Sequence, residues 1–113
     1  MHELSITQSI LSIALEKAKA AQAGKITKIN LTIGELSGIV DESVQFYFEL
    51  ISKDTIAAEA SLSFTRPPTR LRCRNCATIF SPNDIDWTCP GCREQNVEIV
   101  SGRECHVESI EVE

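Results

Sequence analysis

The chain has 113 residues, which is enough for one small domain, or for one core and a module that a metal ion holds together. Its hydrophobic content of 42% and its charged content of 24% are typical of an ordinary soluble globular protein. No apolar run approaches the roughly 20 residues of a membrane helix, and no secretory signal opens the sequence, so we expect a cytoplasmic protein without a membrane span.

The first part of the chain predicts a helix followed by a strand. Apolar residues recur at helical spacing over 4–21. Ser5 and Gln8 have the pattern of a capping box, which places the expected start of the helix at Ser5. Gly24 is expected to stop the helix. Apolar and polar residues then alternate over 25–33, and this period of two predicts a strand with one buried face.

A second helix and a second strand are expected before a pair of prolines. Asp41 can cap a helix at its start. The apolar stripe of this helix consists of Val44, Tyr47, Phe48 and Ile51. Alternation over 59–65 predicts the strand, and Pro67 and Pro68 end it because proline cannot continue a ladder of hydrogen bonds. The prolines therefore mark the boundary of a new module.

Four cysteines follow the prolines as two C-x2-C pairs, Cys73 with Cys76 and Cys89 with Cys92. Two thiolates three positions apart can hold one ion from a single tight turn. A second turn of the same kind completes a tetrahedral site and leaves no open position. We therefore predict a structural Zn²⁺ site on these four residues.

Three other roles for these cysteines compete with zinc. A disulfide framework is disfavoured because the chain has five cysteines, an odd number, and lacks a secretory signal. Iron stays open, since a site of four cysteines accepts both metals. The segment from Cys89 to Cys92 resembles the dithiol of an oxidoreductase, but such motifs normally open a helix, whereas a β-like run follows here.

The last part of the chain predicts one more strand. After Val97, Ile99 and a turn at Ser101-Gly102, a strand is expected from about Arg103 to Val112. Its apolar alternation shifts between Val107 and Ile110, which indicates either a β-bulge or a strand with apolar residues on both sides. Within this strand Cys105 is expected to face the core, and His106 to have a structural role.

The order helix, strand, helix, strand, cysteine module, strand predicts an α+β fold. We expect a small three-stranded sheet with two helices on one face, formed by residues 1–66 and 94–113. A Cys₄ zinc-ribbon module of residues 67–93 is inserted between its strands. So short an insertion cannot bury a core of its own, and its folding should depend on the metal ion.

The charges argue against a nucleic-acid interface. Residues 66–93 carry five arginines and two aspartates, which gives this segment, the module together with Arg66, a net charge of +3. Residues 1–65 carry −3 and residues 94–113 carry −5, and these acidic parts would repel phosphate backbones. The arginines are better explained as a solvated face or as a docking surface for an acidic partner.

Several motifs resemble those of the HypA/HybF family, in the same order over essentially the whole chain. They are the start Met1-His2-Glu3-Leu4-Ser5, the loop Gly34-Glu35-Leu36-Ser37-Gly38, the two C-x2-C pairs with Cys89-Pro90-Gly91-Cys92, and Ser101-Gly102-Arg103-Glu104. The chain departs from the family at Cys105, where an apolar residue is more common, and at Ala77, where a glycine commonly follows the first pair. Neither departure touches a ligand of the motifs.

The resemblance implies a nickel metallochaperone that matures [NiFe]-hydrogenase, and in some organisms urease. It implies that residues 1–66 and 94–113 form a nickel-binding domain and residues 67–93 a structural zinc domain. It places transient Ni²⁺ cargo on Met1, His2 and Glu3, and resident Zn²⁺ on the four paired cysteines. It also implies a HypB-type GTPase and the hydrogenase large-subunit precursor as partners. The sequence leaves monomer and homodimer both open.

The amino terminus suits nickel on chemical grounds as well. The α-amine, the next backbone nitrogen and the His2 imidazole can form fused chelate rings, and nitrogen donors in a plane suit Ni²⁺. Glu3 can add a backbone nitrogen or a carboxylate. The alternative is a zinc-ribbon protein that binds proteins or nucleic acid, in which His2 is an exposed side chain at a frayed terminus. An enzyme is disfavoured, since Asp84 and Asp86 lack a catalytic context and no nucleophile–base pair is evident.

Overall fold

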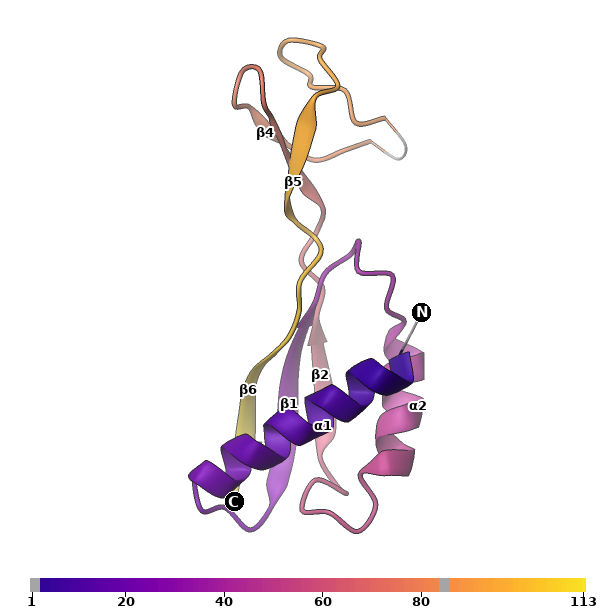
Figure 1. Ribbon diagram of the computed structural model, residues 1–113, viewed down its shortest axis with the longest axis vertical. Coiled ribbons are helices and arrows are strands. Elements are labelled where there is room, and N and C mark those ends of the chain that lie inside the picture. The colour runs from indigo at the N-terminus through magenta and orange to yellow at the C-terminus, as the bar shows by residue number, and fades with distance from the viewer. Residues whose placement is uncertain (1–2, 84–85) are drawn as a thin grey trace.

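The computed structural model describes residues 3–83 and 86–113. The molecule is elongated, with principal extents of 55 × 25 × 17 Å. A body of helices and strands forms one end, a smaller module of short strands forms the other, and two chain segments join them (Figure 1). Among the described residues, no helix is both long enough and apolar enough to cross a membrane.

The body consists of α1 (Glu3–Ala20), β1 (Ile26–Ile33), α2 (Asp41–Ile51), β2 (Ser61–Thr65) and β6 (Cys105–Val112). The second part, here named the distal module, consists of β3 (Arg70–Cys73), β4 (Ile79–Phe80) and β5 (Val97–Ser101) with their loops. The predicted α+β fold, with a three-stranded sheet, two helices and an inserted cysteine module, is confirmed.

The sheet of the body has the strand order β2-β1-β6, so β1 is its central strand. β1 pairs in parallel with β2 and antiparallel with β6. The register between β1 and β6 shifts so that Asn30 faces Ser109 whereas Leu31 faces Val107, which leaves Glu108 as an extra residue. Of the two explanations that the sequence left open for the shift in apolar alternation, the β-bulge is the one found.

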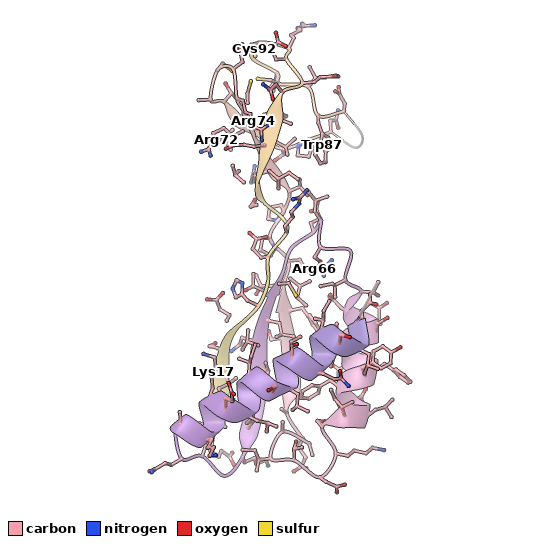
Figure 2. The ribbon with its side chains drawn as sticks, in the orientation of Figure 1. Lys17, Arg66, Arg72, Arg74, Trp87 and Cys92 are labelled. Atoms are coloured by element: carbon pink, nitrogen blue, oxygen red, sulfur yellow. The ribbon has the colours of Figure 1, made fainter. Side chains whose placement is uncertain are left out.

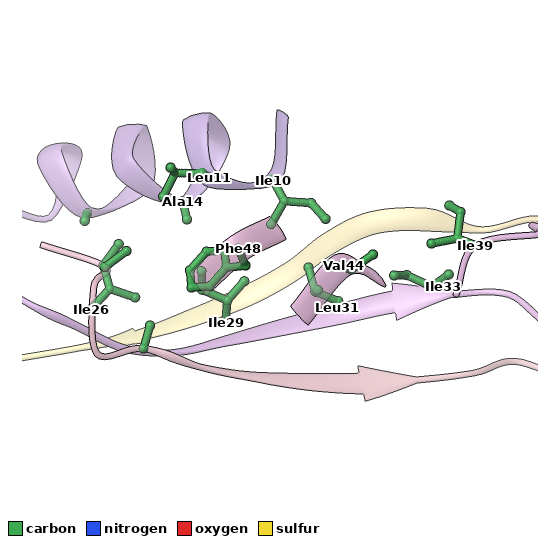
Figure 3. Close-up of a cluster of buried hydrophobic side chains, with 13 residues drawn as sticks. Ile10, Leu11, Ala14, Ile26, Ile29, Leu31, Ile33, Ile39, Val44 and Phe48 are labelled. Atoms are coloured by element: carbon green, nitrogen blue, oxygen red, sulfur yellow. The ribbon is translucent and has the colours of Figure 1, made fainter. Parts of the chain in front are cut away.

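The core of the body lies between the sheet and the two helices (Figure 3). Ile29, Leu31 and Ile33 of β1 alternate along the strand and are each at most 1% exposed, so one face of the central strand is fully covered. α2 contributes Val44 and Phe48 to the same cluster. The helix and strand periods that the sequence predicts thus bring their apolar faces together.

The predicted caps at the helix starts are wrong. α1 already includes Glu3, so Ser5 lies inside the helix and cannot be its cap. At α2, Val40 occupies the N-cap position with φ −97° and ψ 122°, and no side chain caps the helix. Asp41 is the first residue of α2 and forms an ion pair with Arg66, with 2.9 Å between Oδ1 and the guanidinium nitrogen. A carboxylate in the first helical turn remains favourable there because it meets the positive end of the helix dipole.

α1 ends at Ala20, before the glycine that was expected to stop it. Gln22 takes the left-handed conformation with φ 55°, and its N–H donates to Lys19 O at 3.0 Å. The N–H of Ala23 donates to Ala18 O, also at 3.0 Å. These two hydrogen bonds form a Schellman motif, which is a common helix end and here uses glutamine where glycine is usual.

Cys105 is exposed, so the prediction that it faces the core is also wrong. It is the first residue of β6, an edge strand, and it pairs with Ile33 at the end of β1. Burial by its neighbours is only partial, although it is enough to raise the pKa of this thiol.

Both connections between the body and the distal module are hydrogen-bonded to the turn that follows β1. The N–H of Glu35 donates to Pro67 O at 3.0 Å in the first connection, and the N–H of Leu36 donates to Gly102 O at 2.6 Å in the second. A Cβ on Gly34 would lie 2.2 Å from the carbonyl of Gly102, so only glycine allows the two backbones to approach this closely. The two connections are residues 66–69 and residues 102–104.

The division of the chain after residues 66 and 93 stays a prediction. β5 begins at Val97 and pairs with β3 inside the distal module, so the sheet of this module draws on residues that follow 93. The sequence alone did not indicate that this module has a sheet of its own.

Phe48→Ala should lower the free energy of unfolding by about 3–5 kcal/mol, because Phe48 is 1% exposed and its loss leaves a cavity in the only core of the body among the described residues. Chemical denaturation followed by circular dichroism measures the change. Phe46→Ala, on the same helix but 59% exposed, is the matched control and should change stability by less than about 1 kcal/mol. Equal losses in the two variants would show that this core assignment is wrong.

Candidate metal centre

The four cysteines predicted to bind zinc come together at the tip of the distal module, where Figure 2 labels Cys92. Their sulfur atoms all lie within 4.8 Å of one another. Cys73 Sγ is 3.4 Å from Cys92 Sγ, and Cys76 Sγ is 3.6 Å from Cys89 Sγ. Four sulfurs bound at about 2.3 Å to one tetrahedral ion lie roughly 3.8 Å apart, so this cluster fits a single ion of zinc size.

The two cysteine turns have the same backbone geometry. Ala77 N–H donates to Cys73 O at 2.8 Å, and Arg93 N–H donates to Cys89 O at 2.9 Å. Both Ala77 and Arg93 have positive φ, 64° and 65°. In each turn an N–H also points at the first sulfur, as between Asn75 and Cys73 at 3.4 Å. Residue 77 thus holds a left-handed conformation that suits glycine, which is the residue the resemblance led us to expect there.

Hydrogen bonds around the sulfurs favour the thiolate form at two of the four positions. The side chain and backbone of Thr78 lower the pKa of Cys76 to about 6, and its Oγ1 is 3.1 Å from the sulfur. The side chain of Asn75 is the main cause of a lowered pKa at Cys92. At Cys73 the backbone hydrogen bond from Cys76 lowers the pKa, but burial and the neighbouring sulfurs outweigh it and raise the pKa to about 11. A bound cation would displace the remaining protons, because thiolates are the metal-binding form.

Three arginines of the distal module, Arg70, Arg72 and Arg74, contact other residues of the protein. Arg72 on β3 and Arg74, the residue that directly follows this strand, both form ion pairs with Glu98 on β5. The distance between Arg74 Nε and Glu98 Oε2 is 3.5 Å, and Figure 2 labels both arginines. Arg72 first, and then Arg74, hold the pKa of Glu98 below its usual range. Arg70 donates to Ser81 Oγ at 2.7 Å. The two ion pairs with Glu98 leave less positive charge available to a phosphate backbone.

The predicted nickel ligands lie only partly within the described residues, because Met1 and His2 fall outside them. Glu3 is described, and its Oε2 accepts a hydrogen bond from the N–H of Val40 at 3.4 Å. The start of α1 is therefore next to the start of α2, where Asp41 also lies. The sequence did not predict this contact, since no local pattern relates residues so far apart in the chain.

His106 lies on the body and is exposed. Its Nε2 is 2.9 Å from Glu108 Oε1, and Thr32 Oγ1 donates to the same oxygen at 3.0 Å. These two partners, His106 first, hold the pKa of Glu108 below its usual range. The contact of Thr32 with Glu108 joins β1 to β6 at the bulge, whereas the contact of His106 lies within β6. The structural role expected of His106 stays a prediction.

Known proteins resemble this chain over its full length. The family described as HypA, hydrogenase/urease nickel incorporation, metallochaperone, matches residues 1–112. A hydrogenase maturation factor HypA from Dehalococcoides mccartyi is 45% identical over 113 residues, which cover 100% of this chain and 95% of that protein. The protein of the same name from Geobacter sulfurreducens is 42% identical, with both chains covered completely.

Solved structures agree with these matches. The solution structure of the Ni metallochaperone HypA from Helicobacter pylori has a TM-score of 0.72 and 32% identity, with 99% of this chain and 97% of that chain covered. A further solution structure of a HypA protein has a TM-score of 0.79 at 32% identity, with 99% and 96% covered. From the fold, the cysteine cluster and these matches, we conclude that the chain belongs to the HypA family of hydrogenase maturation factors.

Proposed function

We propose that this chain carries Ni²⁺ at its amino terminus and delivers it to the large subunit of [NiFe]-hydrogenase, and to urease in cells that make one. The observation that carries the proposal is the family match, which begins at residue 1 and includes the Met1-His2-Glu3 start. The relative from Helicobacter pylori is itself described as a Ni metallochaperone.

The proposed nickel ligands are Met1, His2 and Glu3. The α-amine, the backbone nitrogens and the imidazole supply nitrogen donors, which suit Ni²⁺ better than the oxygen donors that Mg²⁺ and Ca²⁺ prefer. The hydrogen bond between Glu3 and Val40 supports the proposal, because it holds the start of α1, which follows directly on Met1 and His2 in the chain, beside the start of α2. A site with few side-chain donors can release its ion, as a carrier must.

The proposed resident metal is Zn²⁺ on Cys73, Cys76, Cys89 and Cys92. The spacing of the four sulfurs supports one tetrahedral ion, and a complete set of protein ligands leaves no position for a substrate. We infer that this zinc stabilises the distal module and stays bound while nickel is exchanged at the other end of the molecule.

The proposed partners are a HypB-type GTPase and the hydrogenase large-subunit precursor, which the chain would meet in the cytoplasm. We propose that the chain catalyses no reaction itself. The alternative function, binding of nucleic acid by a zinc ribbon, loses support because Arg72 and Arg74 are engaged by Glu98.

A complementation experiment tests the proposed delivery. In a bacterium that lacks its own HypA, this chain should restore hydrogenase activity, whereas His2→Ala should not. His106→Ala, which changes the only other histidine of the chain at an exposed position, is the control and should restore activity as well as the wild type does. Full activity with His2→Ala at low nickel would contradict the proposal. High external nickel should restore activity without the chain, because a delivery role can be bypassed by mass action.

A further inference from the structure

The body has a groove of about 360 Å³ between α2 and β2. It is lined by Asp41, Glu42, Gln45, Phe46, Glu49 and Phe64. Among residues 3–83 and 86–113, the lining of the groove includes no cysteine, and it does not include Glu3, the one proposed nickel ligand within these ranges. The cysteine cluster therefore does not explain the groove.

The groove contains two aromatic side chains. Phe64 lies on the side of the sheet that faces the helices, because it pairs with the buried Leu31 in parallel register. Phe46 on α2 is 59% exposed, and Leu50, one turn further along the helix, is 50% exposed. A single exposed apolar residue is ordinary, but adjacent ones beside a groove form a surface that a partner can cover.

The rim of the groove is acidic. It carries the carboxylates of Asp41, Glu42 and Glu49. Asp41 pairs with Arg66, whereas the salt bridges found among residues 3–83 and 86–113 give Glu42 and Glu49 no basic partner. The unpaired carboxylates would complement lysine or arginine side chains of a ligand.

The strand beside the groove is an edge strand. β2 pairs only with β1 in the described part of the chain, so its other side carries unpaired backbone N–H and C=O groups. An extended polypeptide can pair with such an edge while its side chains enter adjacent pockets, which is a known mode of peptide recognition. The backbone thus favours a polypeptide over a small molecule as the occupant.

We propose that this α2–β2 groove is a docking site for a segment of a partner protein in which a large apolar side chain is flanked by lysine or arginine. The apolar side chain is held between Phe46 and Phe64, and the basic groups meet Glu42 and Glu49. The inference does not rest on the proposed carriage of nickel, because it is argued only from the described lining of the groove, which does not include Glu3.

Selection from a random peptide library displayed on phage, with the full zinc-loaded chain as the target, tests the proposal. The selected peptides should share a large apolar residue flanked by basic residues. Calorimetry with a synthetic peptide of the selected sequence should show that Phe46→Ala weakens binding by about tenfold or more. Ile13→Ala on α1, where the side chain is 41% exposed, is the matched control and should bind as the wild type does.

Charge variants test the contribution of the acidic rim to peptide binding separately from that of Phe46 and Phe64. Glu42→Gln and Glu49→Gln should each weaken the peptide and reduce the dependence of its affinity on salt, whereas Glu16→Gln on α1 should do neither. Selected peptides without the apolar–basic pattern, or peptides that bind Phe46→Ala unchanged, would overturn the proposal. A homodimer that Phe46→Ala dissociates would assign the groove to a second copy of the chain, and would also overturn it.

Discussion

His2→Ala should weaken nickel binding by at least about 100-fold and leave the zinc content at one ion per chain. The expected loss is large because the imidazole is a direct ligand in the proposed site, and even the loss of a group that only orients a metal ligand costs about 10–100-fold in affinity. Titration calorimetry with zinc-loaded protein measures the nickel affinity, and elemental analysis measures zinc. His106→Ala should bind nickel as the wild type does.

The same site should respond to acid and to extension of the terminus. Ligands must lose their protons before they coordinate, and the reference pKa values are about 6.5 for histidine and about 7.7–8.0 for an α-amine. Nickel affinity should therefore fall as the pH falls from about 7.5 to about 6. A tag that extends the chain before Met1 should remove the α-amine donor and weaken nickel at every pH. An affinity that neither acid nor the tag changes would place the nickel site elsewhere in the chain.

Cys73→Ser or Cys89→Ser should cause loss of zinc and unfolding of the distal module, while the body stays folded. Both cysteines are at most 1% exposed, and Leu71 is the only other apolar side chain that is buried among the described residues of this module. So small a core cannot offset the conformational entropy of the chain, whereas binding of zinc to such sites contributes about 10–16 kcal/mol. The body has its own cluster of buried side chains and does not depend on the ion.

Hydrogen exchange at the backbone amides distinguishes the two parts of the molecule. In either variant the amides of β3 and β5 should lose protection, and those of β1 should keep it. Cys105→Ser is the matched control, because it makes the same chemical change at an exposed cysteine outside the cluster. If β3 remains protected in a variant that holds no zinc, the ion does not stabilise the distal module and its assignment as structural is wrong.

Patterns within short stretches of sequence predicted most of the fold. The alternation of Ile29, Leu31 and Ile33 identified a strand and its buried face, and the shift after Val107 indicated the bulge as one of two explanations. The spacing of the cysteines likewise predicted that four sulfurs would meet. Each of these patterns works because strand geometry and metal coordination impose a short, regular repeat.

Features that depend on distant or edge contacts could not be predicted in this way. The contact of Glu3 with Val40 joins two helix starts, and the pairing of β5 with β3 closes a sheet across the cysteine cluster. The capping box at Ser5 failed because serine and glutamine are also tolerated inside a helix, where α1 places them. The burial of Cys105 was predicted wrongly because alternation indicates on which face of a strand a residue lies. It does not indicate whether other residues cover that face at the end of an edge strand.

The pairing of β1 has a consequence for how the chain could be shortened. Thr65, at the end of β2, pairs with Thr32, and Cys105, at the start of β6, pairs with the next residue of the same central strand. Neighbouring strands lie about 4.7–4.9 Å apart, so the two points where the chain leaves and re-enters the body are roughly 10 Å from each other. A short loop across the end of β1 could span that gap and keep every strand pair of the body. The distal module could therefore be replaced by a short loop. The shortened chain would retain the amino terminus and the α2–β2 groove in one small domain.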